Sequence, residues 1–109
     1  MLIKKPAAVG DVVTFRISSG EEVIGKWMSD DGDSIVIDKP ISITLQMHQS
    51  GQAGLSFVPF MLSFDDSGKL TFYKNNIVTA PVVTRKDVAT NYISATSSIV
   101  QAAPGSGLV

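Results

Sequence analysis

The sequence predicts an all-β fold, a strongly bent antiparallel barrel of about five strands, and three observations lead to it. Apolar and polar residues alternate over residues 13–17, which is the period-2 pattern of a half-buried strand. Turn signals that contain glycine follow at residues 18–21 and 30–33, as consecutive hairpins require. Between them Gly25 interrupts an apolar strand, and such a glycine indicates a sharp bend or a close approach of another backbone.

A long third strand is expected over residues 35–47, where the apolar side chains occupy odd positions. Because this parity is kept across Pro40, we expect the strand to continue there, with the proline at an edge or a kink. The polar, glycine-rich residues 49–54 predict a hairpin loop. Residues 55–64 then form the returning strand, in which a change of apolar parity across Pro59 predicts a bulge.

The end of the chain predicts two short strands and a helix. Residues 70–74 and 77–83 are short apolar segments on either side of an Asn75-Asn76 turn. From Lys86 onward the apolar residues recur at helical spacing. These assignments divide the chain into an N-terminal arm (1–10), a barrel (11–84) with an insertion (47–69), a C-terminal helix (85–100) and a flexible tail (101–109).

Composition narrows the classes of function. The chain has 109 residues and a formal net charge of −1, so we expect one domain without the basic surface that duplex DNA requires. It has no cysteine, a single histidine and no apolar run of the ~20 residues that a membrane span needs. We therefore expect a soluble, cytoplasmic protein that is not an enzyme, with no metal site, no cofactor and no membrane partner.

Two stretches, in the correct order, resemble the motifs of the Sm/LSm/Hfq superfamily. Residues 11–46 contain a strand, a turn, a strand bent at a glycine and an acidic turn, as the Sm1 motif does. Residues 70–83 contain Phe72-Tyr73-Lys74-Asn75-Asn76-Ile77-Val78, which is similar to the Sm2 motif and its bacterial Hfq version. The resemblance implies a five-stranded, SH3-like barrel, here with an inserted hairpin and a C-terminal helix. It also implies a ring, in which the fourth strand of one subunit pairs with the fifth strand of the next. The alternative fold is an OB-like or another SH3-like barrel, which shares the curvature but not the final two-strand turn.

In that superfamily the two turns line a central pore and bind single-stranded RNA. Carried onto this sequence, the resemblance implies an RNA site made of Asp30, Ser34, Tyr73, Lys74 and Asn75. Ser34 offers one hydroxyl where the superfamily often has an asparagine amide. The acidic turn also lacks an aromatic side chain for base stacking, which is worth ~1–3 kcal/mol per base, and its carboxylates repel phosphate.

Two functions stay open at this point. The first is a non-catalytic ring that binds single-stranded RNA as a chaperone or scaffold, and Lys74 and its polar turn favour it. The second is a structural or protein-interaction ring of the same fold that has lost RNA binding, which the acidic turn and Ser34 favour. Trp27 shares the parity of Val23 and Gly25, so we expect it in the core or a subunit interface rather than in a base-stacking platform.

Overall fold

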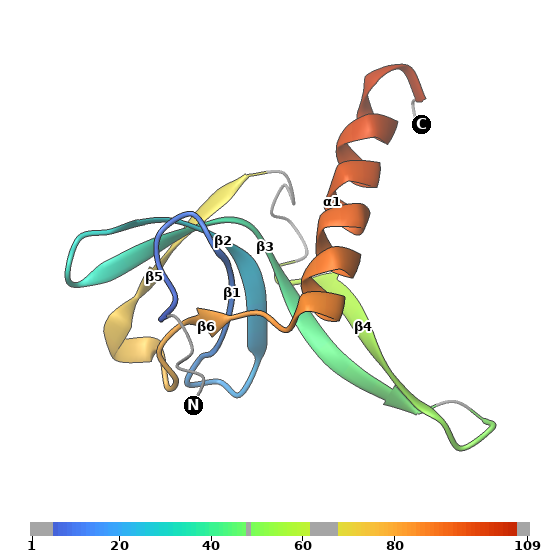
Figure 1. Cartoon of the computed structure of the whole chain (residues 1–109), viewed down its shortest axis with the longest axis horizontal. Coiled ribbons are helices and arrows are strands. Elements are labelled where there is room, and N and C mark those ends of the chain that lie inside the picture. The colour runs from blue at the N-terminus through green and yellow to red at the C-terminus, as the bar shows by residue number, and fades with distance from the viewer. Residues whose placement is uncertain (1–5, 48, 62–67, 107–109) are drawn as a thin grey trace, which may run out of the picture.

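A computed structural model describes residues 6–47, 49–61 and 68–106 of the chain, with residues 98–106 described by their backbone alone (Figure 1). In chain order the elements are β1 (Val12–Arg16), β2 (Glu22–Asp30), β3 (Ser34–Met47), β4 (Ala53–Pro59), β5 (Lys69–Tyr73), a 3-10 turn (Lys74–Asn76), β6 (Val82–Val83) and α1 (Lys86–Ser106). Every strand pair is antiparallel. The prediction of a mainly antiparallel β fold with a C-terminal helix is therefore confirmed.

The sheet is organised around β3. Its strand order is β4-β3-β2-β1-β6, and β5 also pairs with β3. Along one edge β3 pairs with β2, while along the other edge residues 34–38 pair with β5 and residues 41–47 pair with β4. Figure 1 shows the result: the β3–β4 hairpin projects away from the compact part of the sheet formed by β1, β2 and β5. This hairpin corresponds to the first part of the predicted insertion.

In the described part of the chain the sheet is not closed, so the structure shows a bent antiparallel sheet rather than a complete barrel. Within the described residues β5 and β6 do not pair with each other. The strand expected over residues 77–83 is reduced to an isolated bridge between Ile77 and Ile17 and to the two residues of β6. Pro81 lies directly before β6 and has no backbone N–H to donate, which interrupts the ladder there.

The returning strand also differs from the sequence-based expectation. It starts at Ala53, inside the predicted loop, and it ends at Pro59. Its pairing with β3 has one continuous register, so the predicted bulge at Pro59 is wrong. The apolar residues change from odd to even positions there because the strand ends. It ends because a proline has no N–H to donate to the next position of the ladder. Residues 62–64 of the expected strand lie outside the described part of the chain.

Apolar side chains form two separate clusters, one on each face of β2. The inner core consists of Val13, Phe15, Ile17, Val23, Ile35, Ile37 and Phe72. The helix core consists of Ile24, Ile41, Ile43, Val88 and Tyr92, and it joins α1 to the sheet. The neighbours Val23 and Ile24 belong to different cores because consecutive residues of a strand point to opposite faces. β2 is consequently buried from both sides.

A β-bulge lets β3 serve both cores. Its odd-numbered residues within 35–37 belong to the inner core, whereas those within 41–43 belong to the helix core. Between them the β2–β3 register shifts by one residue, so that Lys39 and Pro40 together lie opposite Gly25. The strand therefore continues through Pro40 as predicted. The apolar residues before and after the bulge all have odd numbers, but they point to opposite faces of the sheet.

Gly25 lies where β2 and β3 approach each other closely, as the sequence predicts. A Cβ atom at this position would overlap the Cγ2 atom of Ile37 and would lie 3.0 Å from the carbonyl oxygen of Asp38. The bulge residue opposite, Lys39, has a φ of 54°, in the left-handed region. The absence of a side chain at Gly25 thus leaves space for the bulged strand.

Helix α1 runs to Ser106, past the predicted boundary at residue 100 and into the segment expected to be a flexible tail. Gln101, Ala102 and Ala103 favour the helical conformation, which explains the extension. Tyr92 anchors the helix: its hydroxyl donates to the carbonyl oxygens of Asp38 at 3.1 Å and Lys39 at 2.8 Å. Burial, and secondarily the charge of Asp38, raises the pKa of Tyr92, so the hydroxyl stays a donor. Among the described helices, none is long and apolar enough to cross a membrane.

Candidate functional site

The sheet brings the five predicted site residues to one end of the molecule. Asp30 ends β2, Ser34 begins β3, and Tyr73 ends β5. Ser34 lies opposite Tyr73 in the β3–β5 register, and the backbone N–H of Lys74 donates to the carbonyl oxygen of Asp33 at 2.9 Å. These contacts place the acidic turn between β2 and β3 next to the 3-10 turn that follows β5.

Asp30 and Lys74 form an ion pair across the two turns. The Nζ atom of Lys74 lies 2.8 Å from Oδ1 and 3.0 Å from Oδ2 of Asp30. The hydrogen bond from Lys74 lowers the pKa of Asp30, and a second hydrogen bond from the backbone N–H of Gly32, at 2.9 Å, acts in the same direction. Both side chains remain partly exposed, at 42% for Lys74 and 28% for Asp30. The lysine predicted to bind RNA is thus partly neutralised in this conformation.

Asp31 holds the acidic turn together from the inside. Its Oδ1 atom accepts hydrogen bonds from the backbone N–H groups of Asp33 and Ser34, at 2.9 and 2.8 Å. The hydroxyl of Ser34, which is buried, donates to its Oδ2 atom at 3.1 Å. These contacts lower the pKa of Asp31, the bond from the Ser34 backbone most of all. The Ser34 hydroxyl that the resemblance assigns to RNA is therefore used within the turn.

Acid should destabilise the protein through this turn. A carboxylate whose folded pKa lies below its unfolded value stabilises the fold above the unfolded pKa, and that contribution disappears as the pH falls toward the folded one. We expect the loss below a pH of about 4, the ordinary carboxyl value. Asp31→Asn should have a lower free energy of unfolding at neutral pH. Its free energy of unfolding should also fall less steeply as the pH decreases, which urea unfolding over a pH series measures. Asp33→Asn removes a charge from the same turn but keeps the Asp31 contacts, so a decline as flat as that of Asp31→Asn would contradict this role.

The remaining predicted residues point to solvent. Tyr73 is 61% exposed, and Asn75 is exposed in the 3-10 turn. Within the described part of the chain, neither side chain makes a hydrogen bond. Both side chains are thus exposed at the surface, in contrast to the buried Ser34.

A pocket of about 310 Å³ adjoins the Asp30–Lys74 pair, and we call it the Trp27 pocket. Besides that pair, its lining consists of Trp27, Ile35, Ile77, Ala80 and Pro81. The half-buried Trp27 packs against the inner core, and its indole N–H donates to the carbonyl oxygen of Ser29 at 3.1 Å. Strand parity correctly indicates its contact with the core but gives no sign of the pocket. The pocket depends on residues 77–81, whose path after the 3-10 turn cannot be read from periodicity.

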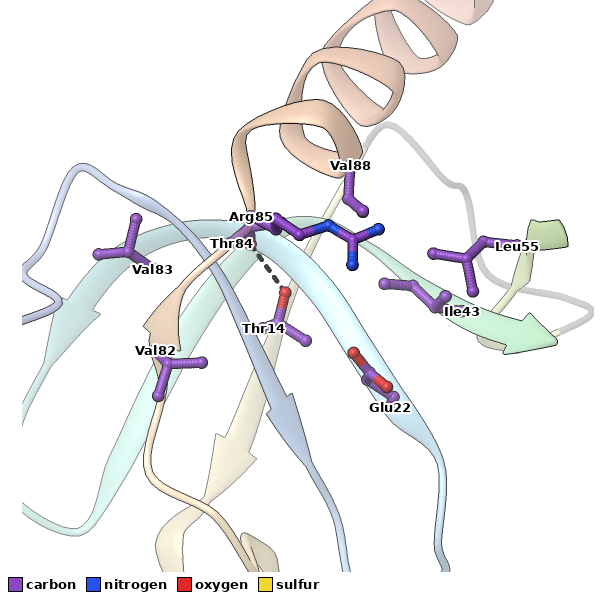
Figure 2. Close-up of a pocket in the computed structure, with 9 residues that line it drawn as sticks. All are labelled: Thr14, Glu22, Ile43, Leu55, Val82, Val83, Thr84, Arg85 and Val88. Atoms are coloured by element: carbon purple, nitrogen blue, oxygen red, sulfur yellow. Dashed lines mark hydrogen bonds between the residues drawn. The ribbon is translucent and has the colours of Figure 1, made fainter.

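A second pocket, of about 340 Å³, lies between the sheet and the start of α1 (Figure 2). Its floor includes the apolar side chains of Ile43, Leu55 and Val88. The two charged residues at its edge have partners elsewhere: Glu22 lies 3.5 Å from Arg16, and Arg85 lies 2.6 Å from Asp87. Its hydroxyl groups, on Thr14 and Thr84, are hydrogen-bonded to each other at 2.7 Å. Because its polar groups are satisfied by one another or by neighbours, this pocket is a weaker candidate site.

Within the described residues, no group of three or more histidine, cysteine, aspartate or glutamate side chains is arranged to hold a metal ion. The single histidine, His48, lies outside those residues. A comparison with models of known protein families gives no match, and a comparison with curated protein sequences gives no significant match.

Proposed function

We propose that this protein binds single-stranded RNA without catalysing a reaction, as an Sm-like ring that acts as a scaffold or chaperone. The observation that carries the proposal is the contact between Asp30 and Lys74, which are 44 positions apart in the sequence. These residues come from the two separate stretches that resemble the Sm1 and Sm2 motifs. Contact between the two motif turns is what the resemblance implies for an RNA site.

The Trp27 pocket supports the same proposal by its size and chemistry. Its volume of about 310 Å³ falls at the lower end of small-molecule sites, which span roughly 300–1,000 Å³. Trp27, Ile77 and Pro81 offer apolar surface for a nucleobase, and the mouth carries one cation and one carboxylate. A base enters beside the indole, and the Lys74 ammonium meets the phosphate or an acceptor on the base edge.

Ring formation is supported by the strands at the two ends of the sheet. In the described residues β5 pairs only with β3, and β6 pairs only with β1, so each has an edge available for another chain. Pairing of β5 in one subunit with β6 in the next covers both edges, which otherwise favour aggregation. Light scattering should then give a closed oligomer, and a monomer at micromolar concentration would contradict the ring.

Two substitutions at the ion pair should change RNA affinity in opposite directions. Lys74→Ala removes a cation and should weaken binding of short uracil-rich or adenine-rich RNA about tenfold, the equivalent of ~1.4 kcal/mol. Asp30→Asn removes the carboxylate that neutralises Lys74 and should strengthen binding. Fluorescence anisotropy over a salt series measures both, because affinity for phosphate falls as salt rises. Lys86→Ala, at the start of α1 and outside the Trp27 pocket, is the matched control.

The alternative, a ring that only contacts proteins, is favoured by the same ion pair and by the internal hydrogen bond of Ser34. Both remove groups that RNA would use. If the wild-type protein assembles but shows no saturable RNA binding at low salt, the interaction ring is the better account. If wild type and both variants bind RNA equally, the RNA site lies away from these turns.

A further inference from the structure

A third pocket, which we call the Lys39 pocket, lies on the opposite face of β2 from the Trp27 pocket. It has a volume of about 360 Å³ between α1 and the bulged part of β3. Lys26 lines it, while the next residue, Trp27, lines the other pocket, since consecutive strand residues point to opposite faces. Among the described residues, its lining includes Lys26 from β2, Asp38 and Lys39 from β3, and Tyr92, Thr96 and Ser97 from α1.

This pocket gathers two lysines for which the described residues show no ion pair, although Lys26 lies opposite Asp38 in the β2–β3 register. In the described part of the chain, the ion pairs involve Arg16, Lys74 and Arg85, and neither Lys26 nor Lys39 lies within ion-pair distance of a carboxylate. Asp38 is the one acidic residue of the lining, so the ionisable side chains there sum to one positive charge. Counted over the described lining residues, this pocket thus carries a local excess of positive charge, although the whole chain has a net charge of −1.

The backbone of Lys39 is held in place from two sides. Its φ of 54° is the only positive φ among the described residues other than glycine. Its N–H donates to the carbonyl oxygen of Gly68 at 2.8 Å, and its carbonyl oxygen accepts from the Tyr92 hydroxyl at 2.8 Å. The Cα–Cβ bond of Lys39 therefore leaves the backbone in a fixed direction. A left-handed lysine that costs conformational energy and lines a pocket is a reason to look for a ligand.

The hydroxyl groups around the two lysines differ in what they can offer. The Tyr92 hydroxyl donates to the bulge carbonyls, and the Thr96 hydroxyl donates to the carbonyl oxygen of Tyr92 at 2.9 Å. Ser97 is exposed at the rim of the pocket and adds a hydroxyl there. The lining residues whose polar side chains are not used in those bonds are therefore Lys26, Lys39, Ser97 and the acidic Asp38.

We propose that the Lys39 pocket binds a phosphate group between the ammonium groups of Lys26 and Lys39, with the Ser97 hydroxyl as a further donor. An ammonium group is a compact point charge that suits the oxygens of phosphate. The polar character of the lining favours a compact anion over an apolar ligand, and Asp38 limits the site to one anionic group. The proposal rests on this pocket alone, so it does not require the RNA function proposed above.

The test titrates the full-length protein with inorganic phosphate, with adenosine monophosphate and with a short uracil-rich RNA, followed by backbone amide NMR shifts. Lys26→Gln and Lys39→Asn are the test variants, and asparagine is chosen because it tolerates the left-handed conformation. We expect saturable shifts around Lys26, Lys39 and Ser97, with at least fivefold weaker binding in each variant, about 1 kcal/mol. Lys86→Gln, outside this pocket, should bind as wild type does.

The three titrants separate the two sources of phosphate. Binding of phosphate and the mononucleotide, with no competition from RNA, supports a site for a free anion. If the shifts caused by RNA depend on Lys26 and Lys39, they support a contact between the Lys39 pocket and the RNA backbone. If RNA binding depends on Lys74 alone, the RNA site is the Trp27 pocket, and the Lys39 pocket is excluded as an RNA site. No saturable shift with any of the three, or equal affinity in both variants and wild type, overturns the proposal. Thermal melts of each variant show that it is folded.

Discussion

Gly25→Ala is expected to lower the free energy of unfolding by about 3 kcal/mol or more, because nothing near the new methyl group can yield. The added Cβ would overlap Ile37, which is fully buried in the inner core, and would press on the backbone oxygen of Asp38. Lys39 and Pro40 close the space from the bulge opposite. Urea unfolding measures the loss, and a cost under 1 kcal/mol would mean that β2 and β3 are further apart than described.

Gly20→Ala is the matched comparison for this prediction. Gly20 also matters for its backbone, with a φ of 101°, but no atom lies within 4 Å of a Cβ added there. Its substitution should cost only the backbone strain, ~1–2 kcal/mol. A double-mutant cycle adds a second test, because Ile37→Ala removes the overlapping atom. The pair Gly25→Ala and Ile37→Ala should therefore be less destabilising together than the sum of the two single changes.

Tyr92→Ala should have the second large effect, because Tyr92 is the larger of the two α1 side chains in the helix core. The side chain is 3% exposed and packs edge-on against Phe57 with ring centroids 6.5 Å apart. Its loss leaves a cavity over Ile24 and Ile41 of the helix core, and we expect a cost of ~3–5 kcal/mol. The unfolding free energy from urea titration and the helical circular dichroism signal should both decrease.

Tyr92→Phe separates packing from hydrogen bonding at the same position. It keeps the ring but removes the donor to the carbonyl oxygens of Asp38 and Lys39, which should cost ~1–2 kcal/mol. A loss equal to that of alanine would show that the ring contributes little and that the hydroxyl fixes the helix. No loss at all would show that water replaces the hydroxyl at the bulge.

The sequence predicts the local features of this fold well, because they depend on neighbouring residues. Alternation identifies β1, glycine and polar residues identify the turns, and helical spacing identifies α1. It predicts β6 poorly, since a two-residue strand has no periodicity. The reversal of faces within β3 is invisible to parity, because Ile37 and Ile41 are four positions apart and would share a face in a regular strand. Only pairing with β2 reveals the extra residue.

The candidate site shows a similar division. The resemblance to two motifs selects Asp30 and Lys74, and the fold brings them together. It does not indicate that they neutralise each other or that Asp31 uses the hydroxyl of Ser34, because both depend on side-chain geometry across two turns. Trp27 and Lys26 are assigned to opposite faces by alternation, but the pockets they line depend on segments distant in sequence, residues 77–81 and α1.

The bulge at Lys39 and Pro40 also bears on how this chain tolerates changes in length. In most strands, insertion or deletion of one residue inverts every side chain beyond it, so such changes are rarely accepted. Here the inversion is already part of the fold, and deletion of one bulge residue would restore plain alternation. Ile41 would stay opposite Ile24 and Ile43 would still face α1, while the inner core would keep all its members. Loss of one residue at this position would therefore preserve both layers of the protein, whereas the same loss between Ile41 and Ile43 would turn Ile43 away from α1.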